Sequence, residues 1–318
     1  MSKLIYLDST NRLRRFKYAR RRFEPPLVVF ENEIQVTRDR VREWVTNLNV
    51  SFIVPIIDAY VQETPPLGMC LPYLIAERDN KTLSTLSDLV FTMQIHASLI
   101  DDITWLAGGP TIFKNTVLIA ALSYRIAQLF CKLEAMTRQR LAVHYEEKIP
   151  KIVDASLALA FPRMSVISPE HVLDIYRQRS TFVYSLACGL ASRIVGDHEE
   201  QIRLASRFGE GIALAYCLLD DIEDLTADIG EKRLSYPICY MKSNQPIDLT
   251  DLDAVIDAIM TTAKVAISLS KSSIRYLKHQ KRLRKKEYLI WLAREFIPAR
   301  IENTAEVVTR KLRETIII

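Results

Sequence analysis

Residues that form tight turns are scarce in this chain. It has 318 residues, of which only 8 are glycine and 13 are proline, and no Asn-Gly or Asp-Gly pair occurs in it. A β-rich fold needs a turn every few residues, and tight turns depend on Gly, Pro, Asn and Asp. The sequence therefore predicts long elements joined by few turns, which means an all-α fold.

Hydrophobic periodicity places helices along the whole chain. Between residues 83 and 106, apolar side chains recur at three- and four-residue spacing, as on one face of a helix. We expect a helical stretch over residues 31–62 that is bent or ended by Pro55, and one or two helices over 112–147. Further helices are expected over 168–194 and 198–228, and again after a loop at 230–237. No linker, internal repeat or low-complexity tract divides them. Residues 1–318 are therefore expected to form a single domain, with residues 1–30 as a basic N-terminal extension.

Cysteine usage and hydropathy bear on the cellular compartment. The 5 cysteines lie among apolar residues without C-x-x-C spacing, which favours free thiols over disulfides or a zinc site. The N-terminus has no apolar stretch behind a basic start, and the longest uncharged runs are too short to span a bilayer. We therefore expect a cytoplasmic protein.

Basic residues concentrate in two stretches, residues 12–22 and 278–286, and the net charge is +5. Two interpretations of these stretches stay open. They are either ordinary solvated faces or a surface for an anionic membrane or an acidic partner. No nucleic-acid-binding motif accompanies the charge, so nucleic acid is not expected as a partner.

Adjacent aspartates occur twice inside apolar helical segments. Asp101 and Asp102 lie in IHASLIDDITW, and Asp220 and Asp221 lie in ALAYCLLDDIEDL. In the second segment Asp224 follows Asp220 by four residues, so the two carboxylates share one helix face. Two carboxylates on one face suit Mg²⁺ that keeps waters and bridges to a diphosphate. The spacing therefore predicts a Mg²⁺ site, with ordinary surface acids on amphipathic helices as the alternative.

Several motifs, in their order and spacing, resemble the trans-isoprenyl diphosphate synthase (polyprenyl synthetase) family. FGEGIALAYCLLDDIEDL resembles the family's glycine-rich lead-in to a complete second D-D-x-x-D motif. YRQRSTFVYSLACGLASRIVGD resembles its Lys-Thr helix, GGPTIFKNTVLIAAL the stretch after its first motif, and RLSYPI its Gly-Lys-x-Thr-x-Pro loop. The resemblance implies a class I isoprenoid synthase fold, a helical bundle around a central apolar cavity, and a homodimer.

The resemblance also implies roles for individual residues. Arg179 and Ser180 stand at the Lys-Thr positions and Arg233 at the loop lysine, so they would bind the substrate's diphosphate. Arginine keeps the positive charge of lysine and adds a fork of donors. The carboxylates implied to hold Mg²⁺ are Asp101, Asp102, Asp220 and Asp224, and Asp221 joins them as a catalytic residue.

The chain departs from the family pattern where the family carries cations. Trp105 stands in place of the last aspartate of the first motif, and apolar residues replace the two arginines that follow. Gly68, Met69 and Leu71 stand at the basic positions of the Gly-Gly-Lys-Arg-x-Arg-Pro element, and Cys217 replaces the glutamine before the second motif. Apolar residues cannot supply charge-assisted contacts to phosphate. The isopentenyl diphosphate site is thus expected to be lost while the allylic site is retained.

These observations favour a Mg-dependent terpene synthase, a lyase that ionises an allylic isoprenyl diphosphate without condensing it with isopentenyl diphosphate. The resemblance implies that Ala97, one turn before Asp101, lies at the floor under the growing chain, where its small side chain would favour a substrate of farnesyl length or longer. Trp105 and Tyr216 would bind substrate by offering aromatic faces to a carbocation, with plain core packing as the alternative. His96 is expected to be either a structural residue or a proton acceptor.

Two other functions stay open at this point. One is a prenyltransferase that moves the allylic chain to a non-isoprenoid acceptor. The other is a non-catalytic, regulatory subunit of a heteromeric prenyl diphosphate synthase. The intact DDIED segment favours the catalytic functions, because a subunit without catalysis has no need of that face.

Overall fold

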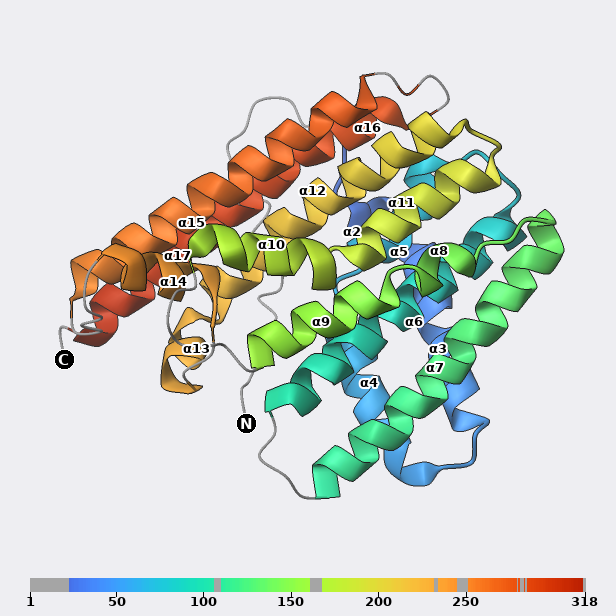
Figure 1. Cartoon of the computed structure of the whole chain (residues 1–318), viewed down its shortest axis with the longest axis horizontal. Helices are drawn as coiled ribbons and strands as arrows, with labels where there is room; N and C mark the ends of the chain where they lie inside the picture. The colour runs from blue at the N-terminus through green and yellow to red at the C-terminus, as the bar shows by residue number, and fades with distance from the viewer. Residues whose placement is uncertain are drawn as a thin grey trace.

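The described part of the chain forms one helical bundle (Figure 1). The computed structural model describes residues 23–105, 110–160, 168–231, 234–244, 251–278, 280, 283 and 285–316. Across these ranges there are α-helices, 3₁₀ turns and a π-helical turn, and no strand, which confirms the all-α expectation. The longer helices are α3 (Glu31–Thr46), α6 (Asn80–Trp105), α7 (Pro110–Thr137), α11 (Phe182–Ile194), α12 (Glu199–Glu223), α15 (Leu252–Ser273) and α17 (Ile297–Ile316).

Shorter elements connect and cover these helices. The short helices are α2 (Pro26–Val29), α4 (Val54–Glu63), α5 (Leu67–Ile75), α8 (Val143–Glu146), α9 (Ile149–Ala160), α10 (Pro169–Arg179), α13 (Leu225–Glu231), α14 (Tyr236–Asn244) and α16 (Lys286–Trp291). The 3₁₀ turns are η2 (Ser51–Ile53) and η3 (Ile274–Leu277), and η4 (Leu292–Phe296) is the π-helical turn.

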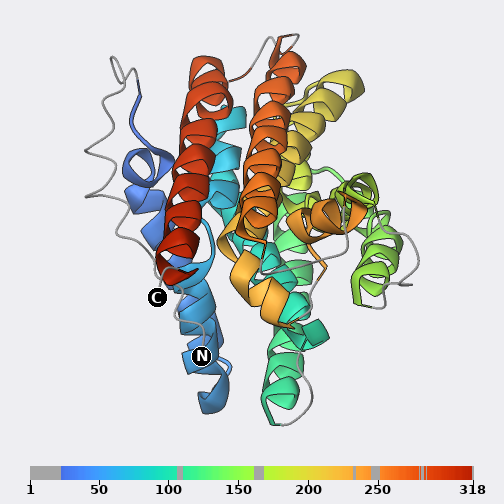
Figure 2. The ribbon, with the colours of Figure 1, turned by 90° about the vertical axis from the view of Figure 1, so that its left-hand side faces the viewer.

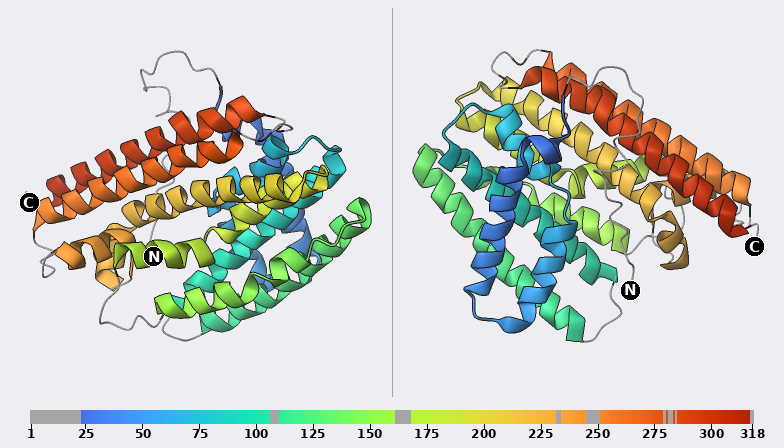
Figure 3. Two further views of the ribbon diagram at one scale, coloured as in Figure 1. Left: turned by 45° about the horizontal axis from the view of Figure 1, so that its top comes forward. Right: turned by 180° about the vertical axis from the view of Figure 1, so that it is seen from behind.

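Helix α12 packs between α11 and α15 in the middle of the bundle (Figure 3). Two glycines allow this close packing. A Cβ atom on Gly209 would lie 2.3 Å from the carbonyl oxygen of Tyr184 on α11, and one on Gly211 would lie 2.8 Å from the Cβ of Ser273 on α15. Glycine weakens an isolated helix, but here the two glycines let α12 run unbroken to Glu223 against both neighbours.

Two of the expected helices are each interrupted at a point that the apolar periodicity does not predict. The helix expected at 168–194 divides into α10 and α11 at Ser180 and Thr181, where the Thr181 hydroxyl donates to the carbonyl of Arg177 at 2.8 Å. Such a bond back to the preceding turn bends helices. The helix expected at 198–228 ends at Glu223, and α13 begins after Asp224.

Prolines act differently from one helix to the next. Pro55 lies in the first turn of α4, where its missing N–H costs nothing. Pro72 lies inside α5. The expected loop at 230–237 is shorter, because α13 reaches Glu231 and α14 begins at Tyr236, one residue before Pro237.

Helix α7 lies at the edge of the bundle, packed along α6 (Figure 1). Leu118, Leu122 and Leu133 on its inner face are fully buried. The segment Ile112–Thr137 is long and apolar enough to cross a membrane by length and composition, and 33% of its most apolar window is buried in the bundle. The expectation from the sequence concerns uncharged runs, and this segment is interrupted by charged residues such as Lys114, Arg125 and Lys132.

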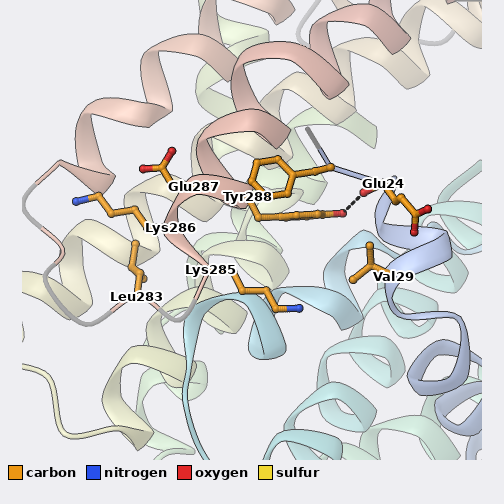
Figure 4. A pocket seen from close by; sticks show the side chains of 8 residues that line it. Glu24, Val29, Leu283, Lys285, Lys286, Glu287 and Tyr288 are labelled. Atoms are coloured by element: carbon orange, nitrogen blue, oxygen red, sulfur yellow. Dashed lines mark hydrogen bonds between the residues drawn. The ribbon is translucent and has the colours of Figure 1, made fainter. Parts of the chain in front are cut away.

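The described N-terminal segment is held against the C-terminal half of the chain. Phe23 packs on Tyr288 and Trp291, with ring centroids 5.4 and 5.9 Å apart, and the Tyr288 hydroxyl donates to the Glu24 carbonyl at 2.8 Å. A pocket of about 620 Å³ lies here, lined by Phe23, Glu24, Val29, Leu283, Lys285, Lys286, Glu287 and Tyr288 (Figure 4). It lies at the end of the bundle away from α13 (Figure 1). The expected central apolar cavity stays a prediction.

Lysines of the second basic stretch, residues 278–286, contact the backbone of that stretch and a nearby aromatic ring. The Lys286 ammonium donates to the carbonyls of Lys278 and Gln280, and the Lys285 ammonium lies 4.6 Å from the centroid of the Phe30 ring. The first basic stretch, residues 12–22, lies outside the described residues. All 5 cysteines are free, as expected.

Candidate functional site

The second aspartate motif lies at the C-terminal end of α12, next to α13 (Figure 1). Asp220 is in the last turn and Asp224 is the C-cap, with its N–H donating to the Asp220 carbonyl at 2.8 Å. The helical spacing therefore persists to Asp224, and both residues are exposed. The structure thus brings Asp220 and Asp224 together as predicted.

Asp220 is in a strongly negative environment. The residue reaches solvent, yet the protein around it displaces much of its water, and this desolvation is the main cause of a pKa well above the ordinary value. The carboxylates of Glu223 and Asp224 raise the pKa further, and the guanidinium of Arg300 opposes them. A cation held by Asp220 and Asp224 would relieve this repulsion.

Asp221 has a different surrounding from its neighbour. It is 9% exposed, and both of its carboxylate oxygens accept from the Tyr176 hydroxyl, at 2.9 and 3.0 Å. One of these oxygens also accepts from the backbone N–H of Tyr236 at 2.9 Å. Burial raises the pKa of Asp221 to about 7, and these hydrogen bonds hold it below what burial alone would give. Asp221 joins α12 to α10 and to the start of α14.

Arg300, a cationic residue on the C-terminal helix α17, also lies at this end of α12, and the sequence does not predict this contact. Arg300 on α17 lies over the Tyr216 ring, 5.4 Å from its centroid, and 4.0 Å from a carboxylate oxygen of Glu223. The same Glu223 oxygen lies 3.4 Å from the donating hydroxyl of Thr304. No motif marks residues 300 and 304, because only the folded contact between α12 and α17 brings them here.

Tyr216 and Tyr184 form an aromatic surface beside the carboxylates. Their ring centroids are 6.2 Å apart at 62°, and their exposures are 8% and 7%. Tyr216 lies one turn before Asp220 on α12, and its expected contact with substrate stays a prediction. The amide nitrogen of Gln94 on α6 lies 3.5 Å from the Tyr184 hydroxyl, which connects this surface to the helix of the first aspartate pair.

The expected phosphate-binding residues of α10 also lie near the motif. Ser180 is the C-cap of α10, and its side chain lowers the pKa of the Cys217 thiol on α12, which burial raises. Arg179 is half-buried, and its charge lowers the pKa of both Tyr176 and Cys217, so its guanidinium lies close to α12. Arg233 lies outside the described residues.

The first aspartate motif is described only by its backbone. Asp101, Asp102 and Trp105 end α6, and their side chains lie outside the described part. Ala97, one turn earlier, is half-buried. His96 shares a 2.9 Å hydrogen bond with the Ser123 hydroxyl of α7, and burial lowers its pKa, which fits a neutral structural histidine.

The segment that matches the family's basic element lies in the core. Gly68 is buried, and Met69 and Leu71 are 1% and 0% exposed within α5. A Cβ on Gly68 would lie 2.4 Å from the Gln94 amide oxygen and 2.8 Å from the Tyr184 ring. There is no room for a cationic side chain at Gly68.

Within the described part of the chain, a divalent metal at this site would need ligands in addition to Asp220 and Asp224. Among the described residues, no group of three or more His, Cys, Asp or Glu side chains is placed to hold a metal ion. Asp220 and Asp224 are oxygen donors with excess negative charge, and Mg²⁺ is commonly held by one or two carboxylates together with waters and phosphate oxygens. The residues present fit Mg²⁺ in that form.

Comparison with known proteins identifies the fold. No model of a protein family matches the chain. A stretch of 72 residues is 32% identical to the geranylgeranyl diphosphate synthase of Sulfolobus acidocaldarius, which is 23% of this chain and 21% of that protein. The chain thus matches about a fifth of the length of this curated relative.

Solved structures match over most of the chain. A geranylgeranyl pyrophosphate synthetase from Geoglobus acetivorans superposes with a TM-score of 0.70 at 13% identity, covering 86% of this chain and 98% of its own. A polyprenyl synthase from Roseobacter denitrificans gives 0.68 at 16% identity, covering 86% and 97%. A geranylgeranyl pyrophosphate synthase from Corynebacterium glutamicum, complexed with calcium and isoprenyl diphosphate, gives 0.57 at 16% identity, covering 91% and 98%. The expected isoprenyl synthase fold is confirmed.

Proposed function

We propose that this chain, which has the fold of the polyprenyl diphosphate synthases, ionises an allylic isoprenyl diphosphate with Mg²⁺ and does not extend it with isopentenyl diphosphate. The first part of the proposal rests on Asp220, Asp224 and Arg179, which gather oxygen ligands and a phosphate-binding cation at one end of α12. Structures of this fold include one complexed with a divalent cation and isoprenyl diphosphate.

The observation that carries the second part is the burial of Gly68, Met69 and Leu71. These residues stand where the resemblance predicts cations for the second diphosphate, and they are packed into the core. A second diphosphate would need several charge-assisted contacts. Without those cations, the diphosphate of isopentenyl diphosphate has no positively charged partners at this position. The proposed allylic site keeps Asp220, Asp224 and Arg179.

The proposed ionisation gives each of these residues a task. Asp220 and Asp224 would hold Mg²⁺, and Arg179 would contact the diphosphate oxygens. Bound Mg²⁺ supplies Lewis-acid neutralisation of the charge on the departing diphosphate. Tyr216 and Tyr184 then present aromatic faces to the allylic cation, and their burial keeps water from capturing it. Loss of a proton to the released pyrophosphate, directly or after ring closure, would complete a lyase reaction.

The test is incubation of the purified full chain with Mg²⁺ and single allylic diphosphates of ten, fifteen and twenty carbons. Release of pyrophosphate with a terpene product, in the absence of isopentenyl diphosphate, supports the proposal. Asp220→Asn should lower the release roughly 100-fold or more, while Asp253→Asn, an exposed aspartate of α15, should leave it unchanged. Elongated diphosphates formed only after isopentenyl diphosphate is added would overturn it.

A second copy of the chain is the partner we propose for α7. Its outer face exposes Phe113 (66%) and Tyr124 (62%), and the segment Ile112–Thr137 has a high mean hydropathy despite exposed Lys114 and Lys132. Burial of this face in a homodimer would remove apolar surface from water. If the pure chain is inactive and this face binds a different synthase, these results would favour a regulatory subunit over an enzyme.

A further inference from the structure

Arg300 gives the carboxylate end of α12 a permanent cation that the sequence motifs do not include. Its guanidinium lies over the Tyr216 ring and beside Glu223, and its charge also acts on Asp220. Burial lowers the pKa of Arg300, but these neighbours outweigh burial and keep the pKa above the ordinary value. Arg300 is thus firmly charged next to the residues proposed to hold the diphosphate through Mg²⁺.

The backbone before Arg300 explains its direction. Pro298 has no N–H and its ring crowds the carbonyl four residues earlier, so it disfavours regular α-helical hydrogen bonding at this point. The chain forms the π-helical turn η4 instead, in which the Ile297 N–H donates to the Leu292 carbonyl. Each residue added to a helix turns the following side chains by about 100°. The π-turn therefore sets the face of α17 on which Arg300 lies.

A side chain from α15 completes the π-turn. The Ala293 carbonyl is five residues before Pro298, which cannot donate to it, and Ile297 donates to Leu292. The buried hydroxyl of Ser270 donates to the Ala293 carbonyl instead, at 2.8 Å. The irregular turn is thus supported from a neighbouring helix, and π-turns of this kind often lie at functional sites.

The guanidinium of Arg300 can still donate hydrogen bonds to an anion. Arginine has five N–H donors in a planar fork that fits phosphate oxygens. Arg300 lies 4.0 Å from the Glu223 oxygen and 43% of its side chain is exposed. Among the described residues, its charge also acts on Asp220, so it is next to the carboxylates proposed to hold a Mg-bound diphosphate.

We propose that Arg300 is a diphosphate-binding residue, directed by the Pro298 π-turn, that takes over the task of the arginines missing after the first aspartate motif. This inference rests on the proposed function, because it assumes that Asp220 and Asp224 hold a Mg-bound diphosphate. In the absence of ligand, Arg300 neutralises part of the carboxylate charge and so competes with the metal.

The test is a calorimetric titration of the full chain, first with MgCl₂ alone and then with inorganic pyrophosphate in saturating Mg²⁺. Arg300→Gln should weaken pyrophosphate binding about 10- to 100-fold, as expected for the loss of a charge-assisted contact. The same substitution should tighten the binding of Mg²⁺ alone, because a competing cation is removed. Arg300→Lys should lie between Arg300→Gln and the unaltered chain, and Arg294→Gln, an exposed arginine of η4, should match the unaltered chain in both titrations.

Opposite changes in the two affinities separate a binding role from a structural one. If both affinities of Arg300→Gln fall together with its melting temperature, or if it binds pyrophosphate as the unaltered chain does, the inference is wrong. Asp220→Asn distinguishes this failure from failure of the proposed function. If Asp220→Asn loses pyrophosphate binding and Arg300→Gln does not, only the inference fails; if the unaltered chain does not bind pyrophosphate with Mg²⁺, both fail.

Discussion

The Tyr176 hydroxyl donates to both carboxylate oxygens of Asp221, at 2.9 and 3.0 Å, and so ties α10 to the helix that carries the second aspartate motif. The contact is buried, and Asp221 also receives the N–H of Tyr236 at the start of α14. Asp221 is therefore best understood as a positioning residue, whose neighbour Asp220 faces the solvent.

Tyr176→Phe should destabilise the protein and loosen the site. It removes both hydrogen bonds and leaves a buried carboxylate under-satisfied, which costs about 2 kcal/mol of unfolding free energy. We also expect weaker pyrophosphate binding in Mg²⁺, since the end of α12 loses its tie to α10. Urea unfolding and calorimetry measure the two effects. Tyr240→Phe removes an exposed tyrosine hydroxyl that donates to Asp257 and should change neither.

His96 should make the stability depend on pH. Burial lowers its pKa, so the folded state favours the neutral ring, which shares a hydrogen bond with Ser123. The unfolded state then binds more protons as the pH falls below the ordinary histidine value, and stability is lost on acidification. The unfolding free energy should fall from pH 7 to pH 5 more steeply in the unaltered chain than in His96→Gln. Parallel curves for the two proteins would contradict this.

Ser270→Ala should cost about 1–3 kcal/mol of unfolding free energy, because it removes the buried donor to the Ala293 carbonyl and leaves that carbonyl without this partner. Thermal and urea unfolding measure the loss. Ser272→Ala on the same helix is the matched control, since Ser272 is exposed and donates only to the nearby Leu269 carbonyl. Equal stability of the two variants would show that the π-turn does not depend on Ser270.

Tyr124→Glu should shift the chain toward monomer if α7 covers a second copy. The substitution puts a charge in the middle of the apolar outer face, where Tyr124 is 62% exposed in the single chain, and burying an unpaired carboxylate is unfavourable. Sedimentation velocity measures the association, and Tyr124→Phe should retain it. A monomeric unaltered chain would refute the proposed dimer directly.

Site residues that are close together in the sequence could be predicted to lie together. Residues that only long-range packing brings to the site could not. The four-residue spacing of Asp220 and Asp224 is enough to place them on one helix face, and the match to a family motif places Arg179 and Ser180 near them. Arg300 and Thr304 follow Asp220 by some eighty residues, and nothing local connects them. Only the packing of α17 against α12 brings them together.

Backbone irregularities were missed for a related reason. Apolar periodicity passes through Thr181 without interruption, because it does not register a hydroxyl that bonds to the preceding turn. Pro298 is visible in the sequence, but its effect depends on whether a neighbouring helix supplies a donor. Ser270 supplies it, so the helix makes a π-turn and continues to Ile316 instead of ending.

The last turn of α12 carries acidic side chains, which interact unfavourably with the helix dipole. The carbonyls at a helix C-terminus carry partial negative charge, and basic side chains normally compensate it there. The last turn of α12 has no basic residue, and Asp220, Glu223 and Asp224 add to the negative potential. Arg300 of α17 offsets part of this negative potential. The turn is still maintained at an electrostatic cost, and a divalent cation bound there would act as a helix cap, coupling substrate-site occupancy to the stability of the central helix.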